Sequence, residues 1–157
     1  MNQSSQLLPE QQLDGSELTV GIIVARYNWP ITGELLQLAR EELRHLNVAP
    51  EHVHVVSVPG AYELPSAAQA MLRGGRYDAL ICFGCVMKGE TRHDVVVSDA
   101  AAQGLLRVSL DTHIPVVFGV MCAETQQQAE ARIPRGSECA RTAVEMACTV
   151  RLLAQER

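Results

Sequence analysis

The chain has 157 residues, of which 47% are hydrophobic and only 4% are aromatic, and its formal net charge is -5. At this length we expect one compact domain, with a core of Val, Ile, Leu and Ala such as buried parallel sheets have. The acidic balance excludes a general nucleic-acid-binding protein, which needs a basic face. The sequence contains neither an apolar run long enough to span a membrane nor a signal peptide at its start. We therefore expect a cytoplasmic protein without a membrane partner.

Residues 1–17 are polar, rich in Gln and Ser, and predict a flexible N-terminal arm, whereas residues 18–157 predict a single domain. In chain order the expected elements are a strand at 18–25, a helix at 31–46, a strand at 53–58, a helix at 66–72, a strand at 79–83, a helix at 93–110, a strand at 115–120, and helices at 124–132 and 136–153. This alternation favours right-handed crossovers, and thus a flavodoxin-like three-layer αβα sandwich with four parallel strands. The arm is a candidate for a fifth strand.

Five cysteines are scattered through apolar segments, and two of them, Cys82 and Cys85, form a C-x-x-C pair. A redox site would place this pair at the start of a helix, and a zinc site would need a second pair of ligands. Neither context is visible, so we interpret the two residues as buried, reduced thiols at the end of a strand. We predict no metal site.

The chemistry is expected where the strands end, because the carboxyl ends of parallel strands meet at one edge of a sheet. The loops expected there are Arg26–Pro30, Pro59–Pro65, Gly84–His93 and Met121–Thr125. Together they offer an aromatic ring, amide and carboxylate groups, glycine-rich backbone donors, and a histidine that opens a helix. This set suits a flat polar molecule and a phosphate group.

The same loops carry a family resemblance. The strings ARYNWPIT, VPGAYELP, CVMKGETRHDVV and SLDTHIPVVFGVMCAETQQQAEAR resemble the successive motifs of the lumazine synthase family, in the same order and with matching separations from Leu18 to Ala147. The resemblance implies a transferase of riboflavin biosynthesis. Its penultimate step condenses 5-amino-6-(D-ribitylamino)uracil with 3,4-dihydroxy-2-butanone 4-phosphate, giving 6,7-dimethyl-8-ribityllumazine, and needs neither cofactor nor metal.

The resemblance also implies a role for each matching residue. His93 transfers protons, and Tyr27 stacks on the pyrimidine ring. The other substrate-binding residues are Asn28, Ala61, Tyr62 and Glu63 for the ring and ribityl chain, Val86 and Met87 for the pyrimidine edge, Gly89, Glu90 and Thr91 for the phosphate, Arg132 as its charged partner, and Phe118. Phe118 packs over the ligand from an adjacent subunit, which implies a homopentamer or a multiple of pentamers. Riboflavin synthase is a candidate partner.

Simpler interpretations stand beside these roles. Tyr27 could simply be a half-buried aromatic residue at a strand end, and Phe118 could be a core residue. Arg132 could be a cation placed at the end of a helix to interact with its dipole. A lone histidine at a helix start is more often a cap or surface residue than a catalyst.

Two departures from the family pattern support an alternative function. Arg92, Asp94 and Val95 stand where the family usually has Pro, Phe and Asp, and the link after Arg132 is shortened to residues 133–138. The alternative is a non-catalytic paralogue that binds lumazine or flavin. An electron-transfer or signalling domain on the same fold is disfavoured, because its acidic cluster or flavin phosphate loop is not seen.

Overall fold

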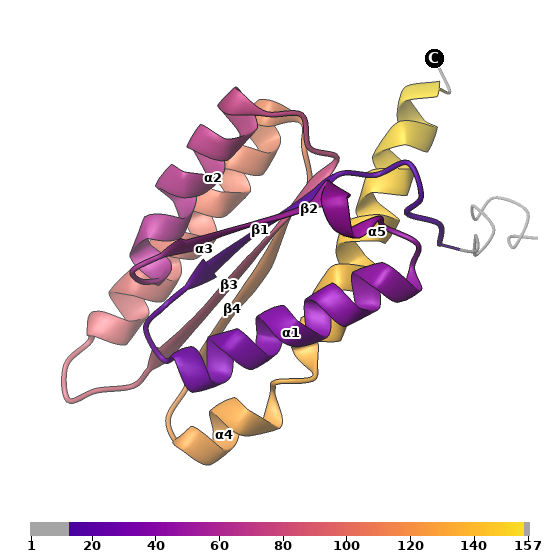
Figure 1. Ribbon diagram of the computed structural model, residues 1–157. Coiled ribbons are helices and arrows are strands. Elements are labelled where there is room, and N and C mark those ends of the chain that lie inside the picture. The colour runs from indigo at the N-terminus through magenta and orange to yellow at the C-terminus, as the bar shows by residue number, and fades with distance from the viewer. Residues whose placement is uncertain (1–12, 156–157) are drawn as a thin grey trace, which may run out of the picture.

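The computed structural model describes residues 13–155, and these contain one parallel four-stranded sheet (Figure 1). Its strands are β1 (Val20–Ala25), β2 (Val53–Val58), β3 (Ala79–Met87) and β4 (Val116–Ala123), in the order β2-β1-β3-β4. Every neighbouring pair is parallel. Because each connection passes through a helix, the carboxyl ends of all four strands lie at the same edge of the sheet.

Helices cover both faces of the sheet. Figure 1 shows α1 (Trp29–His45) and α5 (Arg135–Gln155) on one face, and α2 (Leu64–Gly74) and α3 (His93–Thr112) on the other. The short elements are α4 (Gln126–Ala131) and the 3-10 helices η2 (Pro50–His52) and η3 (Ala61–Glu63). The arrangement confirms the predicted flavodoxin-like sandwich.

Successive side chains of each buried strand point to opposite faces of the sheet, and this divides the core into two halves. In β1, Ile22 belongs to the cluster formed with α1 and α5, whereas its neighbour Ile23 belongs to the cluster formed with α2 and α3. Both side chains are fully buried. Since successive side chains of a strand point to opposite faces, a strand that is apolar throughout requires helices on both sides.

The third strand is longer than predicted. We expected it to end at Phe83, with a loop from Gly84, but β3 continues to Met87, which pairs with Ala123. Gly84 is a packing residue here, because a Cβ at this position would lie 3.2 Å from the Cβ of Ala61 and 3.4 Å from Val120. β4 likewise runs to Ala123 rather than Val120, so the loops predicted from Gly84 and Met121 begin at Lys88 and Glu124 instead.

The C-x-x-C residues are free, buried thiols, as predicted. Cys82 and Cys85 lie in β3 and belong to opposite faces of the sheet. Burial raises the pKa of the Cys82 thiol to about 12. Burial, together with nearby Cys122, also raises the pKa of Cys85.

Two features are absent from the described residues. Nowhere in this part of the chain do three His, Cys, Asp or Glu side chains gather in a way that could hold a metal ion. Among residues 13–155, no helix combines the length and the apolar character that crossing a membrane requires.

The predicted N-terminal arm lies mostly outside the described residues, and with it the candidate fifth strand. Of the arm, residues 13–17 can be described. Gly15 is buried at the end of α1, where its N–H donates to the carbonyl of Leu46 (2.6 Å). Beside it, hydrogen bonds from the backbone and hydroxyl of Ser16 lower the pKa of Asp14.

Candidate active site

The loops after β1 and β2 are tied together by their backbones. The N–H of Arg26 donates to the carbonyl of Val58 (2.8 Å), and the N–H of Tyr27 donates to the carbonyl of Pro59 (2.9 Å). These bonds continue the β1–β2 pairing past the ends of the strands. The backbone of Tyr27 is therefore fixed beside the loop that leads into η3.

Asn28 connects this corner to β3. It precedes α1 with a φ of 63°, in the left-handed region that Asn tolerates better than most residues. Its Nδ2 donates to the carbonyl of Cys85 (2.7 Å). The amide nitrogen thus holds the first loop against the third strand, while the amide oxygen is a separate group that a ligand can use.

Exposed aromatic rings stand above these loops. Tyr27 is 65% exposed and Tyr62, in η3, is 63% exposed. Ala61, which begins η3, is buried. Glu63 is half-buried, and its Oε1 accepts the N–H of Gly60 (3.1 Å). This bond supplies the partner that a carboxylate in an apolar turn needs.

The loop between β3 and α3 is open to solvent. β3 ends with Val86, which is buried, and Met87, which is half-buried. Gly89, Glu90 and Thr91 are exposed, and a Cβ placed on Gly89 would meet nothing within 4 Å. The loop leads straight into α3, a 20-residue helix, and amides at a helix start attract anions.

α3 begins at His93, as predicted. Its side chain is exposed, and its backbone N–H donates to Oγ1 of Thr91 (3.3 Å). An exposed imidazole directly after a loop that offers free amides at a helix start can exchange protons with a ligand held there.

The corner after β4 brings charges to the same edge. Lys88 follows β3, and its N–H donates to the carbonyl of Ala123 (2.8 Å), while its Nζ contacts Oε1 of Glu124 (3.2 Å). Arg132 follows α4, and its Nη1 donates to the carbonyl of Cys122 (3.2 Å). Because neighbouring carbonyls of a strand point in opposite directions, Cys122 offers its oxygen to the free side of β4.

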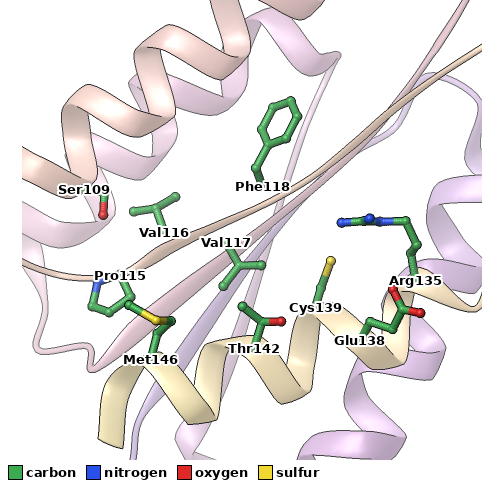
Figure 2. Close-up of a pocket in the computed structure, with 10 residues that line it drawn as sticks. All are labelled: Ser109, Pro115, Val116, Val117, Phe118, Arg135, Glu138, Cys139, Thr142 and Met146. Carbon is green, nitrogen blue, oxygen red and sulfur yellow. The ribbon is translucent and has the colours of Figure 1, made fainter. Parts of the chain in front are cut away.

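Phe118 lies away from the strand ends where the other predicted site residues gather. It pairs with Cys82, five residues before the end of β3 at Met87, or about 16 Å back along the strand. It is 38% exposed and lines a cavity of about 480 Å³ at the free side of β4, whose other lining residues come from α3, the start of β4 and α5. In Figure 2, Phe118 points to the opposite side of β4 from Val117, which faces Thr142 and Cys139 of α5.

Comparison with known proteins shows the family. The family model of 6,7-dimethyl-8-ribityllumazine synthase matches residues 17–151. The chain belongs to this family. The proteins named 6,7-dimethyl-8-ribityllumazine synthase from Azoarcus sp., Cupriavidus necator and Albidiferax ferrireducens are 44%, 45% and 42% identical to it. The alignments cover 92%, 90% and 93% of this chain and 93%, 86% and 94% of those relatives.

Within this lumazine synthase family member, the fold brings one part of the predicted site together and leaves another part aside. The residues that gather at the ends of β1, β2 and β3 are Tyr27, Asn28, Ala61, Tyr62, Glu63, Val86, Met87, Gly89, Glu90, Thr91 and His93. Arg132 lies at the end of the neighbouring strand, β4. Phe118 is the exception, since it lies in the middle of β4.

Two residues at this edge were not predicted. Lys88 could have been found from its position directly before the Gly89-Glu90-Thr91 loop, where a cation strengthens an anion site. Gly60 could be read only as a turn residue, because the ring that covers it comes from a loop more than thirty positions earlier.

Proposed function

We propose that this chain condenses 5-amino-6-(D-ribitylamino)uracil with 3,4-dihydroxy-2-butanone 4-phosphate to form 6,7-dimethyl-8-ribityllumazine and inorganic phosphate. The observation that carries the proposal is the meeting, in a member of this family, of an exposed aromatic ring, a glycine-containing loop at a helix start and an exposed histidine. The reaction is the penultimate step of riboflavin biosynthesis, and the enzyme is a transferase.

The pyrimidine stacks on Tyr27, whose ring offers an open aromatic face. Asn28, Glu63 and the backbone groups of Ala61 and Tyr62 bind the ring and the ribityl hydroxyls. The backbone groups of Val86 and Met87, at the end of β3, align the pyrimidine edge. The support for these roles is that all of these groups face one edge of the sheet.

The phosphate binds to the amides of Gly89, Glu90 and Thr91, at the start of α3. The positive end of the helix dipole and the open space around Gly89 support this role. Arg132 is its charged partner, because a guanidinium binds phosphate through several parallel hydrogen bonds.

His93 moves the protons of the reaction. The 5-amino group attacks the ketone and forms a Schiff base with loss of water, phosphate is then eliminated, and ring closure releases a second water. Each step takes a proton from one atom and gives one to another, which an imidazole can do in both directions at neutral pH. The proposal requires no cofactor.

The active unit is a homopentamer or a multiple of pentamers, in which Phe118 of one subunit completes the site of its neighbour. Two features support a shared site: Phe118 lies far back along β4 from the other site residues, and large apolar side chains are exposed on α3 and α5. The most exposed of these are Val96, Leu106, Leu110 and Leu153. Exposed apolar surface of this extent is typical of an interaction face.

The proposal extends to the enzyme's surroundings. Riboflavin synthase is a partner because it consumes the product. A reducing cytoplasm is the proposed location, and the five free cysteines support it.

The deciding experiment mixes the purified protein with both substrates and follows the absorbance and fluorescence of the lumazine against the slow spontaneous reaction. A rate well above this background is the expected result. Binding of the pyrimidine without acceleration would contradict the proposal and favour a non-catalytic paralogue.

A further inference from the structure

Gly60 lies directly against the ring of Tyr27. A Cβ added to Gly60 would lie 2.6 Å from Cδ2 and 2.9 Å from Cε2 of that ring, closer than real Cβ atoms approach other heavy atoms. The backbone itself does not require glycine, because Gly60 has a φ of -143° and a ψ of -178°, an extended conformation that any residue adopts. The ring of Tyr27, and not the turn, therefore excludes a side chain at this position.

Hydrogen bonds fix the backbone of both residues in this contact, Tyr27 and Gly60. The N–H of Tyr27 donates to the carbonyl of Pro59, one residue before Gly60, at 2.9 Å. The N–H of Gly60 donates to Oε1 of Glu63 at 3.1 Å. With the backbones on both sides fixed, the ring cannot move away from Gly60 without turning about its own side-chain bonds.

The Cδ2–Cε2 edge of the ring abuts Gly60, yet the residue is 65% exposed, so the rest of the ring is open to a ligand. What stands at this edge sets how close the ring can lie to the loop after β2. A residue without a side chain allows the closest approach.

We propose that Gly60 is a positioning residue of the pyrimidine subsite: by lacking a side chain at the edge of the Tyr27 ring, it sets the place of the ring on which the flat heterocycle stacks. Glu63 acts with it by holding the Gly60 peptide in place. This inference rests on the proposed function and deepens it, because it names the feature that fits the subsite to a flat ring.

The test is the Gly60→Ala variant of the full-length protein. The added methyl displaces the ring by about 1 Å, and misplacement of this size can cost about 100-fold in rate. We expect the KM for the pyrimidine substrate to rise and its kcat/KM to fall by about 10- to 100-fold. The KM for the butanone phosphate should change less than about twofold, because that substrate does not touch the ring.

Gly74→Ala is the matched control. It adds the same methyl at the end of α2, where a Cβ meets nothing within 4 Å. This variant should have the kinetics of the wild type. Thermal unfolding of both variants shows whether the fold is kept.

A double variant separates positioning from general damage. If Gly60 acts through the ring, the Gly60→Ala change should have no further effect once Tyr27→Ala has removed the ring. An equal loss in both backgrounds, or a rise in both KM values, would overturn the inference.

The outcome can be separated from that of the proposed function. If the wild type does not accelerate the reaction, the proposed function fails, and calorimetric binding of 5-amino-6-(D-ribitylamino)uracil then decides the inference. Weaker binding by the Gly60→Ala variant would support the subsite, whereas equal binding, or no binding by either protein, would overturn it.

Discussion

Around the ends of β1, β2 and β3, loops from distant parts of the chain bond to one another, whereas along the free side of β4 large apolar side chains face the solvent. At the first edge the bonds of Tyr27 to Pro59 and of Asn28 to Cys85 fix the loops before any ligand arrives. At the second edge Phe118 is 38% exposed, and on α3, which packs against β4, Leu106 is 61% exposed. We therefore expect one chain to build the proposed pyrimidine and phosphate subsites by itself and a second copy to supply the rest.

The largest expected effect comes from Leu106→Asp. A charge at this exposed position changes the free energy of unfolding of a single chain by no more than about 0.5 kcal/mol. In an apolar interface it would be buried without a partner, so we expect loss of the assembly and a turnover close to the spontaneous rate. Sedimentation velocity and the lumazine assay measure the two effects.

Arg40→Asp is the control for that variant, since it places the same side chain on exposed α1, across the sheet from α3. It should keep both assembly and turnover. An assembly of unchanged size in the Leu106→Asp variant would show that this face of α3 is not an interface.

The next largest effect concerns the proposed chemistry at the first edge, where β1, β2 and β3 end. His93→Ala should lower kcat by about 100- to 10,000-fold, the usual contribution of a positioned acid or base. Assembly and binding of the pyrimidine should stay intact, which distinguishes this loss from that of Leu106→Asp. His52→Ala changes an exposed histidine in η2 and should have no effect on kcat. An unchanged kcat in His93→Ala would remove His93 from the mechanism.

A smaller effect is expected from Asn28, which holds the first edge together. Asn28→Ala loses the bond to Cys85 and places alanine at a φ of 63°, so it should lower the free energy of unfolding by about 2 kcal/mol. Asn28→Gly loses only the bond and should be about 1 kcal/mol more stable than Asn28→Ala. Denaturant unfolding measures both changes.

Asn47 provides the comparison for this pair, because it has a similar φ of 69° but an exposed side chain. Asn47→Gly should be nearly neutral. If Asn28→Gly is also neutral, the bond to Cys85 does not hold the corner.

The smallest effect lies in the interior between the two edges. Cys82 ordinarily would lose its proton near pH 9.0, but burial holds its pKa at about 12 in the folded chain. Between these values the unfolded chain binds fewer protons, so stability falls as the pH rises. From pH 9 to pH 10 the wild type should lose about 1 kcal/mol more than Cys82→Ala. Cys122→Ala removes an exposed thiol and should keep the wild-type slope, and equal slopes in all three proteins would contradict the assignment.

Local patterns were sufficient to predict the order of elements and the start of α3 at His93. These features depend on hydrophobic period and on turn residues that are neighbours in sequence. The extent of β3 depends instead on contacts with residues that are distant in sequence. Gly84 signals a turn or a close approach equally well, and the choice is made by Ala61 and Val120, which are distant in sequence.

The candidate site shows the same limit. Which loops meet could be predicted from the rule for parallel sheets, but the bonds within the site could not. The pairing of Lys88 with Glu124 and the covering of Gly60 by Tyr27 arise only when separate loops are brought together. A strand through Phe118 was predicted, but its pairing with Cys82, far from the end of β3, follows from the strand register, which the sequence pattern leaves open.

The bond between Arg132 and the carbonyl of Cys122 has a consequence for affinity. One N–H of the guanidinium is occupied, and the group has five. A long side chain that is already held in one rotamer has little freedom left to lose when an anion arrives, and for arginine that freedom is worth about 2 kcal/mol. In the proposed phosphate site, Arg132 is thus ordered in advance by the main chain of β4, so we expect more of the phosphate's binding energy to remain available for holding the substrate.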